Sequence, residues 1–165
     1  MGIEKEKNMN VDINVKSLIR DIKGHVKLII VDMMTQKVTI KEYENLFTTV
    51  GKNSLFQRLA GDSSKGLITY GAVGTGLSTP SITDIKLNNE VFRKSISTLL
   101  VNNTLLIARL FLSTSEGNYY LKEFGLFGDN ATGSTDSGTL FDRCIVEHNK
   151  VSSETVTIEV ILEFV

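Results

Sequence analysis

The chain has 165 residues, with 18 Lys and Arg against 19 Asp and Glu, and a formal net charge of −1. A chain of this length fits one domain, or a domain plus an arm, and can bury roughly 70% of its unfolded surface in one core. The balanced charge supplies no broad positive field, which argues against a dedicated binder of nucleic acid or of anionic lipid.

Cys144 is the only cysteine, so an internal disulfide is excluded and synthesis in a reducing cytoplasm is expected. The N-terminal stretch lacks the apolar core of a signal peptide. No later run approaches the ~20 apolar residues that span a membrane. We therefore expect neither secretion nor insertion into a membrane.

The pattern near the N-terminus predicts an arm, residues 1–23, ahead of a single β-domain, residues 24–165. Residues 1–10 are polar and charged, with too little apolar surface to pack on a core. Between Asn14 and Ile22, apolar residues recur at i, i+3, i+4 and i+7, as on one stripe of a short helix. The stripe consists of Val15, Leu18, Ile19 and Ile22.

This apolar stripe must be covered, because a helix of two or three turns is marginal on its own. Packing on its own domain is one interpretation. Docking onto a neighbouring subunit is the other, and it makes the four residues of the stripe predicted subunit contacts.

A period of two replaces the helical period from His25 onward. Val26, Leu28 and Ile30 point to one side, and Val38 and Ile40 resume the alternation after a short turn. This pattern predicts a β-hairpin, although its turn lacks the Asn-Gly or Asp-Gly pair that marks the tightest hairpins.

A short helix is predicted at about residues 53–60. Asn53 or Ser54 can cap its first free N–H groups, and Gly61 suits the left-handed position that closes a helix. The face expected to pack consists of Leu55, Phe56, Leu59 and Ala60.

The rest of the chain is predicted to be strands separated by turns, with a surface loop at residues 129–138. The predicted strands cover residues 66–73, 92–101, 103–114, 119–128, 138–148 and 153–165. The last strand alternates a buried face with a wetter one. Its buried face is expected to hold Val156, Ile158, Val160, Leu162 and Phe164. Many strands and one firm helix favour an all-β fold, a two-layer antiparallel β-sandwich.

Gly71, Gly74 and Gly76 precede the only proline, Pro80. A dinucleotide-binding fingerprint requires a third glycine that opens a helix, but Thr79 stands there, and the Gly-Lys-Ser/Thr triplet of a P-loop is absent. We therefore expect no nucleotide cofactor. The segment is predicted to turn a corner, where the glycines supply positive φ and Pro80 stiffens the exit.

His25 and His148 are the only histidines, so a Ser-His or Cys-His mechanism must use one of them. On a helix Cys144 and His148 would be neighbours. On a strand, at ~3.3 Å per residue, they lie ~13 Å apart, too far to share one metal ion. The strand prediction thus argues against a metal site, and Cys144 is expected to be a small apolar side chain.

Glu123 is unusual because its sequence neighbours are apolar. It is predicted to pair with Arg93 or Arg109, and such a buried pair more often fixes a conformation than catalyses a reaction. No two carboxylates are spaced so that the sequence alone would place them together in a cleft, so no enzymatic activity is expected. A host-surface glycan remains an alternative ligand, because Tyr119 and Tyr120 can stack on sugars in a chain without tryptophan. The long loop at residues 129–138 favours the same alternative.

Four blocks of the sequence carry a family resemblance. They are ENLFTTVGKNSLFQRLAG, ITYGAVGTGLSTPSITDIKLNNEVFRKSI, YLKEFGLFGDNATGSTDSGTLFDRCIVEH and SSETVTIEVILEF. In this order they resemble a module of tailed-bacteriophage virion proteins, described as tail or tail-collar fibre proteins. The Leu…Glu…Arg stretch of that family is matched by Leu87, Glu90 and Arg93, and its Glu-x-Gly-Leu-Phe core by residues 123–127.

The resemblance covers about residues 44–165 and implies a non-enzymatic role in a virion, with no catalytic residues to carry over. It leaves a position on the head, the neck or the tail open. We predict a structural subunit that is assembled in the host bacterial cytoplasm, forms a symmetric homo-oligomer and contacts other virion proteins. Sheet edges and the N-terminal arm are left for these neighbours.

Overall fold

A computed structural model of the protein describes residues 22–164, and within them nine antiparallel strands form one sheet accompanied by one helix. The all-β prediction is therefore confirmed. The elements are β1 (Ile22–Asp32), β2 (Val38–Phe47), α1 (Thr49–Leu59), β3 (Ile68–Gly74), β4 (Glu90–Ser95), β5 (Thr98–Asn102), β6 (Leu105–Leu112), β7 (Tyr120–Gly128), β8 (Thr139–Asn149) and β9 (Glu154–Phe164).

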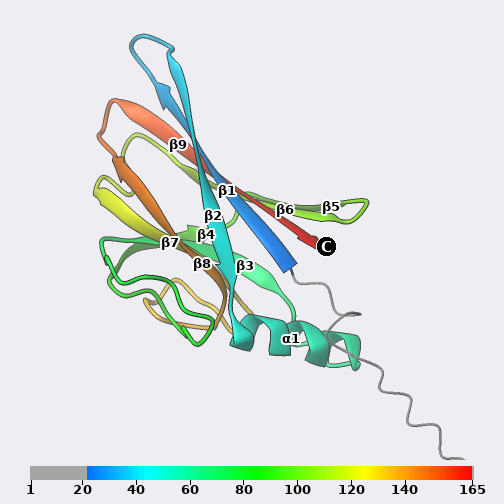
Figure 1. Cartoon of the computed structure of the whole chain (residues 1–165). Helices are drawn as coiled ribbons and strands as arrows, with labels where there is room; N and C mark the ends of the chain where they lie inside the picture. The colour runs from blue at the N-terminus through cyan, green and yellow to red at the C-terminus, as the bar shows by residue number, and fades with distance from the viewer. Residues whose placement is uncertain (1–21, 165) are drawn as a thin grey trace, which may run out of the picture.

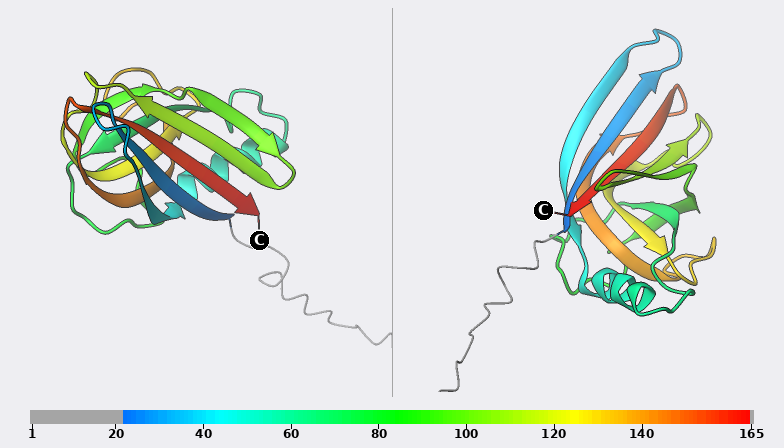
Figure 2. Two further views of the ribbon diagram at one scale, coloured as in Figure 1. Left: turned by 90° about the horizontal axis from the view of Figure 1, so that it is seen from above. Right: turned by 90° about the vertical axis from the view of Figure 1, so that its right-hand side faces the viewer.

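The sheet follows the order β4-β3-β7-β8-β2-β1-β9-β6-β5 and curls so that its two halves face each other (Figures 1 and 2). Strand β2 belongs to both halves. Its residues 38–45 pair with β1, whereas only Leu46 and Phe47 pair with β8. The two predicted layers are thus two halves of one continuous sheet.

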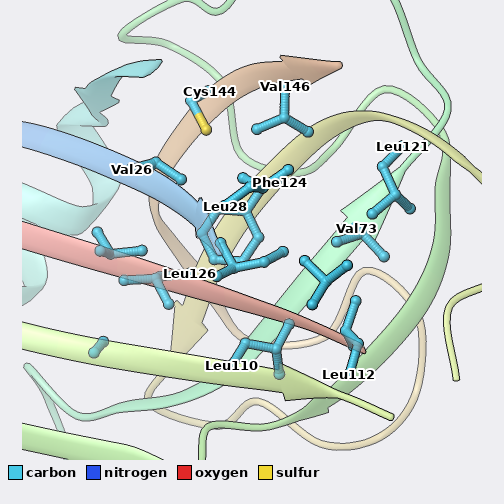
Figure 3. Close-up of a cluster of buried hydrophobic side chains, with 14 of the residues drawn as sticks. Val26, Leu28, Val73, Leu110, Leu112, Leu121, Phe124, Leu126, Cys144 and Val146 are labelled. Carbon is cyan, nitrogen blue, oxygen red and sulfur yellow. The ribbon is translucent and has the colours of Figure 1, made fainter. Parts of the chain in front are cut away.

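The main core lies between these halves (Figure 3). Alternate residues of β1, β6 and β9 point inward, as the period of two requires, and they meet apolar side chains of β3, β7 and β8. Val26, Leu28 and Ile30 of the predicted hairpin are buried, as are Val156, Ile158, Val160 and Leu162 of the last strand. The buried faces predicted for these residues are confirmed.

The hairpin of β1 and β2 is confirmed, and its tip extends beyond the rest of the sheet (Figure 1). Its turn does not use an Asn-Gly pair. Asp32 Oδ1 instead accepts hydrogen bonds from the N–H groups of Met34 and Thr35, at 2.9 and 2.8 Å, and Gln36 takes a positive φ of 58°. An aspartate side chain therefore supplies the local bonds that shape this turn.

The prediction of one strand over residues 92–101 is wrong. β4 ends at Ser95, β5 begins at Thr98, and the two strands lie at opposite edges of the sheet. At the break, the N–H of Ile96 bonds to Thr69 O and the N–H of Ser97 to Arg109 O. The chain crosses between the halves here, and an unbroken apolar pattern does not reveal such a crossing.

The helix begins earlier than predicted. Thr48, not Asn53 or Ser54, is its cap, because Thr48 Oγ1 accepts the N–H of Gly51 at 3.0 Å. The expected packing face is wrong for Phe56 and Leu59, which are 59% and 82% exposed, whereas Leu55 packs on the core.

The buried face of α1 holds Gly51 and Ser54 instead. A Cβ at Gly51 would lie 2.6 Å from Phe141 Cα, so the small residue lets the helix approach β8 closely. Gly61 follows the helix with a φ of +103°, in line with its predicted role.

The strand β1 already begins at Ile22, which pairs with Phe164 and packs on the core. The predicted N-terminal helix therefore does not extend to Ile22. Val15, Leu18 and Ile19 lie outside the described residues, so the contact predicted for them stays a prediction.

Candidate functional site

The glycine segment lies at the end of β3 and continues into the loop that follows. Gly71 and Gly74 belong to β3, and neither they nor Gly76 have positive φ, so that part of the prediction is wrong. Their lack of a side chain instead lets neighbouring atoms lie close to the backbone. A Cβ at Gly74 would lie 2.5 Å from both Asn89 O and Glu123 Oε1.

Glu123 on β7 is the residue that these glycines make room for. Its side chain is fully buried, and its carboxylate accepts three backbone N–H groups. These come from Gly76 at 3.0 Å, Asn88 at 2.8 Å and Asn89 at 2.7 Å. The carboxylate thereby joins the two ends of the loop at residues 75–89, which includes Pro80.

Arg143 on β8 is the charge partner of Glu123. Its Nε and Nη2 donate to Glu123 Oε2 at 3.1 and 2.8 Å. Its other bonds reach into the loop, with Nη1 donating to Asp84 Oδ2 at 2.7 Å and Nη2 to both oxygens of Ser78 at 2.9 Å. The loop is therefore tied at its middle as well as at its ends.

The predicted partners of Glu123 were wrong. Arg93 forms a two-bond ion pair with Glu90, and Arg109 pairs with Glu159. Arg143 was missed, although its signal was the same as that of Glu123, a charge within an apolar strand. In the register of β7 and β8, Arg143 lies opposite Gly125, two residues from Glu123 and on the same face.

Arg93 has a second role at the edge of the sheet. Its Nη1 donates to Ser137 O at 2.7 Å, and its guanidinium lies 4.1 Å from the centre of the Phe127 ring. The loop at residues 129–138 is thus fastened beside β4. In this way Arg93 and Glu123, two of the predicted structural residues, each hold a different loop.

Cys144 and His148 lie on strand β8 in different surroundings. Cys144 is buried in the core, and burial, together with the charge of Asp142, raises the pKa of its thiol. His148 Nε2 lies 2.5 Å from Glu154 Oε1 instead. Within residues 22–164, no three His, Cys, Asp or Glu side chains group as metal ligands would.

Asp142 is a buried carboxylate that the sequence analysis did not single out. Burial raises its pKa to about 6, although the N–H of Leu126 donates to its Oδ1 at 3.0 Å. Among residues 22–164, no cation pairs with Asp142 as Arg143 pairs with Glu123. Asp142 is therefore a source of instability at neutral pH.

The two features that favoured a glycan ligand do not meet. Tyr119 and Tyr120 lie at the start of β7, whereas the loop at residues 129–138 follows its end. The separation along the strand is about 26 Å. Tyr120 also has partners of its own, because its hydroxyl donates to Glu147 Oε1 at 2.6 Å and Lys122 Nζ lies 3.6 Å from its ring centre.

The described part of the chain contains no helix that is long and apolar enough to cross a membrane. Its buried ion pair of Glu123 and Arg143 holds a loop against a curled antiparallel sheet. This arrangement defines a β-sheet structural domain.

A comparison with known families matches residues 39–164 to the phage tail-collar fibre protein, N-terminal family. The match covers most of the chain, which therefore belongs to this family, and the resemblance seen in the sequence is confirmed. No curated protein and no solved structure matches the chain.

Replacing Glu123 with Ala is expected to lower the free energy of unfolding by about 3–5 kcal/mol, because the buried Arg143 loses its main counter-charge. Urea denaturation measures this change. The exposed Glu42, which pairs with Lys27 at 3.3 Å, is the matched control, and Glu42→Ala should cost less than about 1 kcal/mol. Equal effects of the two substitutions would contradict the role assigned to Glu123.

Gly74→Ala is expected to destabilise the domain by about 2 kcal/mol or more, because the new Cβ would overlap Asn89 O and Glu123 Oε1. Thermal denaturation compares it with Gly133→Ala. A Cβ at Gly133 would meet nothing within 4 Å, so that variant should be as stable as the parent. A harmless Gly74→Ala would show that close packing is not the reason for the glycine.

Asp142→Asn is expected to stabilise the domain at pH 7.5. The folded-state pKa of about 6 lies above the ordinary 3.8, so the folded protein binds the proton more tightly than the unfolded chain. The stability contributed by this proton is present below pH 4 and is lost as the pH rises through 6. The gain at pH 7.5 is up to about 3 kcal/mol, and it should vanish at pH 3.5. Urea denaturation at both pH values measures the difference in the free energy of unfolding between the variant and the parent. A less stable variant at pH 7.5 would contradict the prediction.

Proposed function

We propose that the chain is a non-enzymatic structural subunit of a phage tail, an adaptor that helps attach a fibre. The β-domain forms a symmetric oligomer, and residues 1–21 connect it to neighbouring virion proteins. Assembly takes place in the cytoplasm of the host bacterium. The observation that carries this proposal is the family match, which spans the loop-holding pair of Glu123 and Arg143 together with the sheet around it.

The hydrogen bonds of the buried Glu123 carboxylate support a structural role. Glu123 already accepts five hydrogen bonds, three from backbone N–H groups and two from Arg143. A carboxylate whose acceptor positions are occupied in this way is poorly placed to act as a general base. The most conspicuous charged residue of the domain therefore stabilises the fold.

The sheet edges support an oligomer. β4 is protected at its edge, because it carries Glu90, Arg93 and Lys94 and the loop at residues 129–138 is fastened beside it. β5, at the other edge, has the uncharged sequence TLLVN, in which Leu99 is 47% and Val101 74% exposed. An apolar edge strand without charge or proline is a surface for pairing with another chain.

The tip of the β1–β2 hairpin offers a second contact surface, at the far end of β1 from Ile22. Exposed apolar side chains gather there in the strands and in the turn. They are Met33, Met34, Val38 and Ile40. An apolar cluster on an extended hairpin suits contact with another virion protein.

Deletion of residues 1–21 is expected to leave a folded domain that no longer enters phage particles, because the nine strands and the helix of residues 22–164 are all kept. Circular dichroism measures the fold, and complementation of a phage that lacks the gene, followed by immunoblotting of purified particles, measures incorporation. The full-length chain expressed to the same level is the control. Normal incorporation of the shortened, folded chain would refute the connecting role of the segment.

A further inference from the structure

An apolar groove opens at the end of the curled sheet that lies beside α1. Its volume is about 280 Å³, and it is lined from both halves of the sheet and from the helix. Phe47, Ile68 and Leu162 belong to the edge of the core, and Leu55 and Leu106 are half-buried beside them. The groove continues the core to the surface.

The rim of the groove belongs to the β5–β6 hairpin. Val101 faces the same side of the sheet as its partner Leu106, which packs on the core, yet Val101 is 74% exposed. Thr104, in the turn of this hairpin, also lines the groove. Residues 22–164 therefore leave Val101 largely uncovered, although it occupies a position on the inner face.

The N-terminal segment enters the domain at this groove. Ile22, the first described residue, is itself part of the lining, and 21 residues precede it. The apolar residues Val15, Leu18 and Ile19 therefore lie only three to seven positions from the wall of the groove. Between them and Ile22 stand the charged residues Arg20 and Asp21, which suit a turn in solvent.

We propose that the groove binds residues 13–21 of the same chain, with Val15, Leu18 and Ile19 covering the exposed apolar lining. The sequence supplies an apolar stripe that requires cover, and the structure supplies an apolar groove next to its point of attachment. Because the segment is joined to the groove, its effective concentration there is in the millimolar range, above that of a second copy in dilute solution.

This assignment chooses between the two interpretations of the stripe and goes beyond the proposed function. The stripe contacts its own domain, and the polar residues 1–10 ahead of it remain free to reach other virion proteins. The contact exists in the purified chain, so its test does not depend on incorporation into particles.

Engineered disulfides test the contact in the full-length protein. Ser17→Cys, next to the stripe, is combined with Val101→Cys, Asn103→Cys or Thr104→Cys on the rim. The native Cys144 is 1% exposed and stays out of the reaction. At least one pair is expected to form an intrachain disulfide at low micromolar concentration, seen by mass spectrometry and by mobility on a non-reducing gel.

The control pair combines Ser17→Cys with Thr35→Cys at the hairpin tip. Five residues of chain reach about 17 Å at most, whereas β1 alone is about 33 Å long, so no intrachain disulfide is expected in the control. Interchain disulfides at the rim would show that a neighbouring copy occupies the groove, and would overturn the assignment to the same chain. The absence of a disulfide from all three rim pairs would overturn the contact itself.

A second measurement uses charge. Leu18→Asp with Ile19→Asp places two carboxylates on the stripe and is expected to lower Tm by about 5 °C, through loss of apolar burial. Asn14→Asp with Ser17→Asp adds the same charge beside the stripe and should leave Tm within about 1 °C of the parent. Equal Tm values for the two variants would contradict the proposal.

Discussion

Two charges removed from water, those of Glu123 and Arg143, hold the loop at residues 75–89 against the sheet. Each ion loses several kcal/mol of hydration on burial, and mutual attraction offsets this loss only where further hydrogen bonds complete the pair. Here the carboxylate also accepts three backbone N–H groups, and the guanidinium also reaches Asp84 and Ser78. A long segment without regular structure thereby gains a defined path.

The pair also constrains the sequence around it. Gly74 and Gly76 leave the space that the carboxylate occupies, and Gly125 lies opposite Arg143 in the register of β7 and β8. A Cβ at Gly125 would lie 2.8 Å from Asp142 O. These glycines, Glu123 and Arg143 therefore act as one unit, although they lie far apart in the chain.

The sequence predicted much of the fold because the period of two is a local signal. The hairpin of β1 and β2 and the buried face of β9 needed only alternation of apolar and polar side chains. The break between β4 and β5 was missed because FRKSISTLLV gives no local sign that the chain crosses to the other half of the sheet. The same limit applies to the site. Glu123 was conspicuous among apolar neighbours, but its partner depends on strand register, which brought Arg143 within reach instead of Arg93 or Arg109.

The pairing of β1 with β9 gives the molecule two different ends. Ile22 lies opposite Phe164, so both ends of the described chain leave from one pole, and the turn at residues 33–37 marks the other, about 33 Å away along β1. Any polypeptide joined upstream or downstream projects from the first pole and leaves the second unobstructed. The exposed apolar cluster at the tip therefore faces away from those connections, and a neighbouring protein can reach it without meeting them.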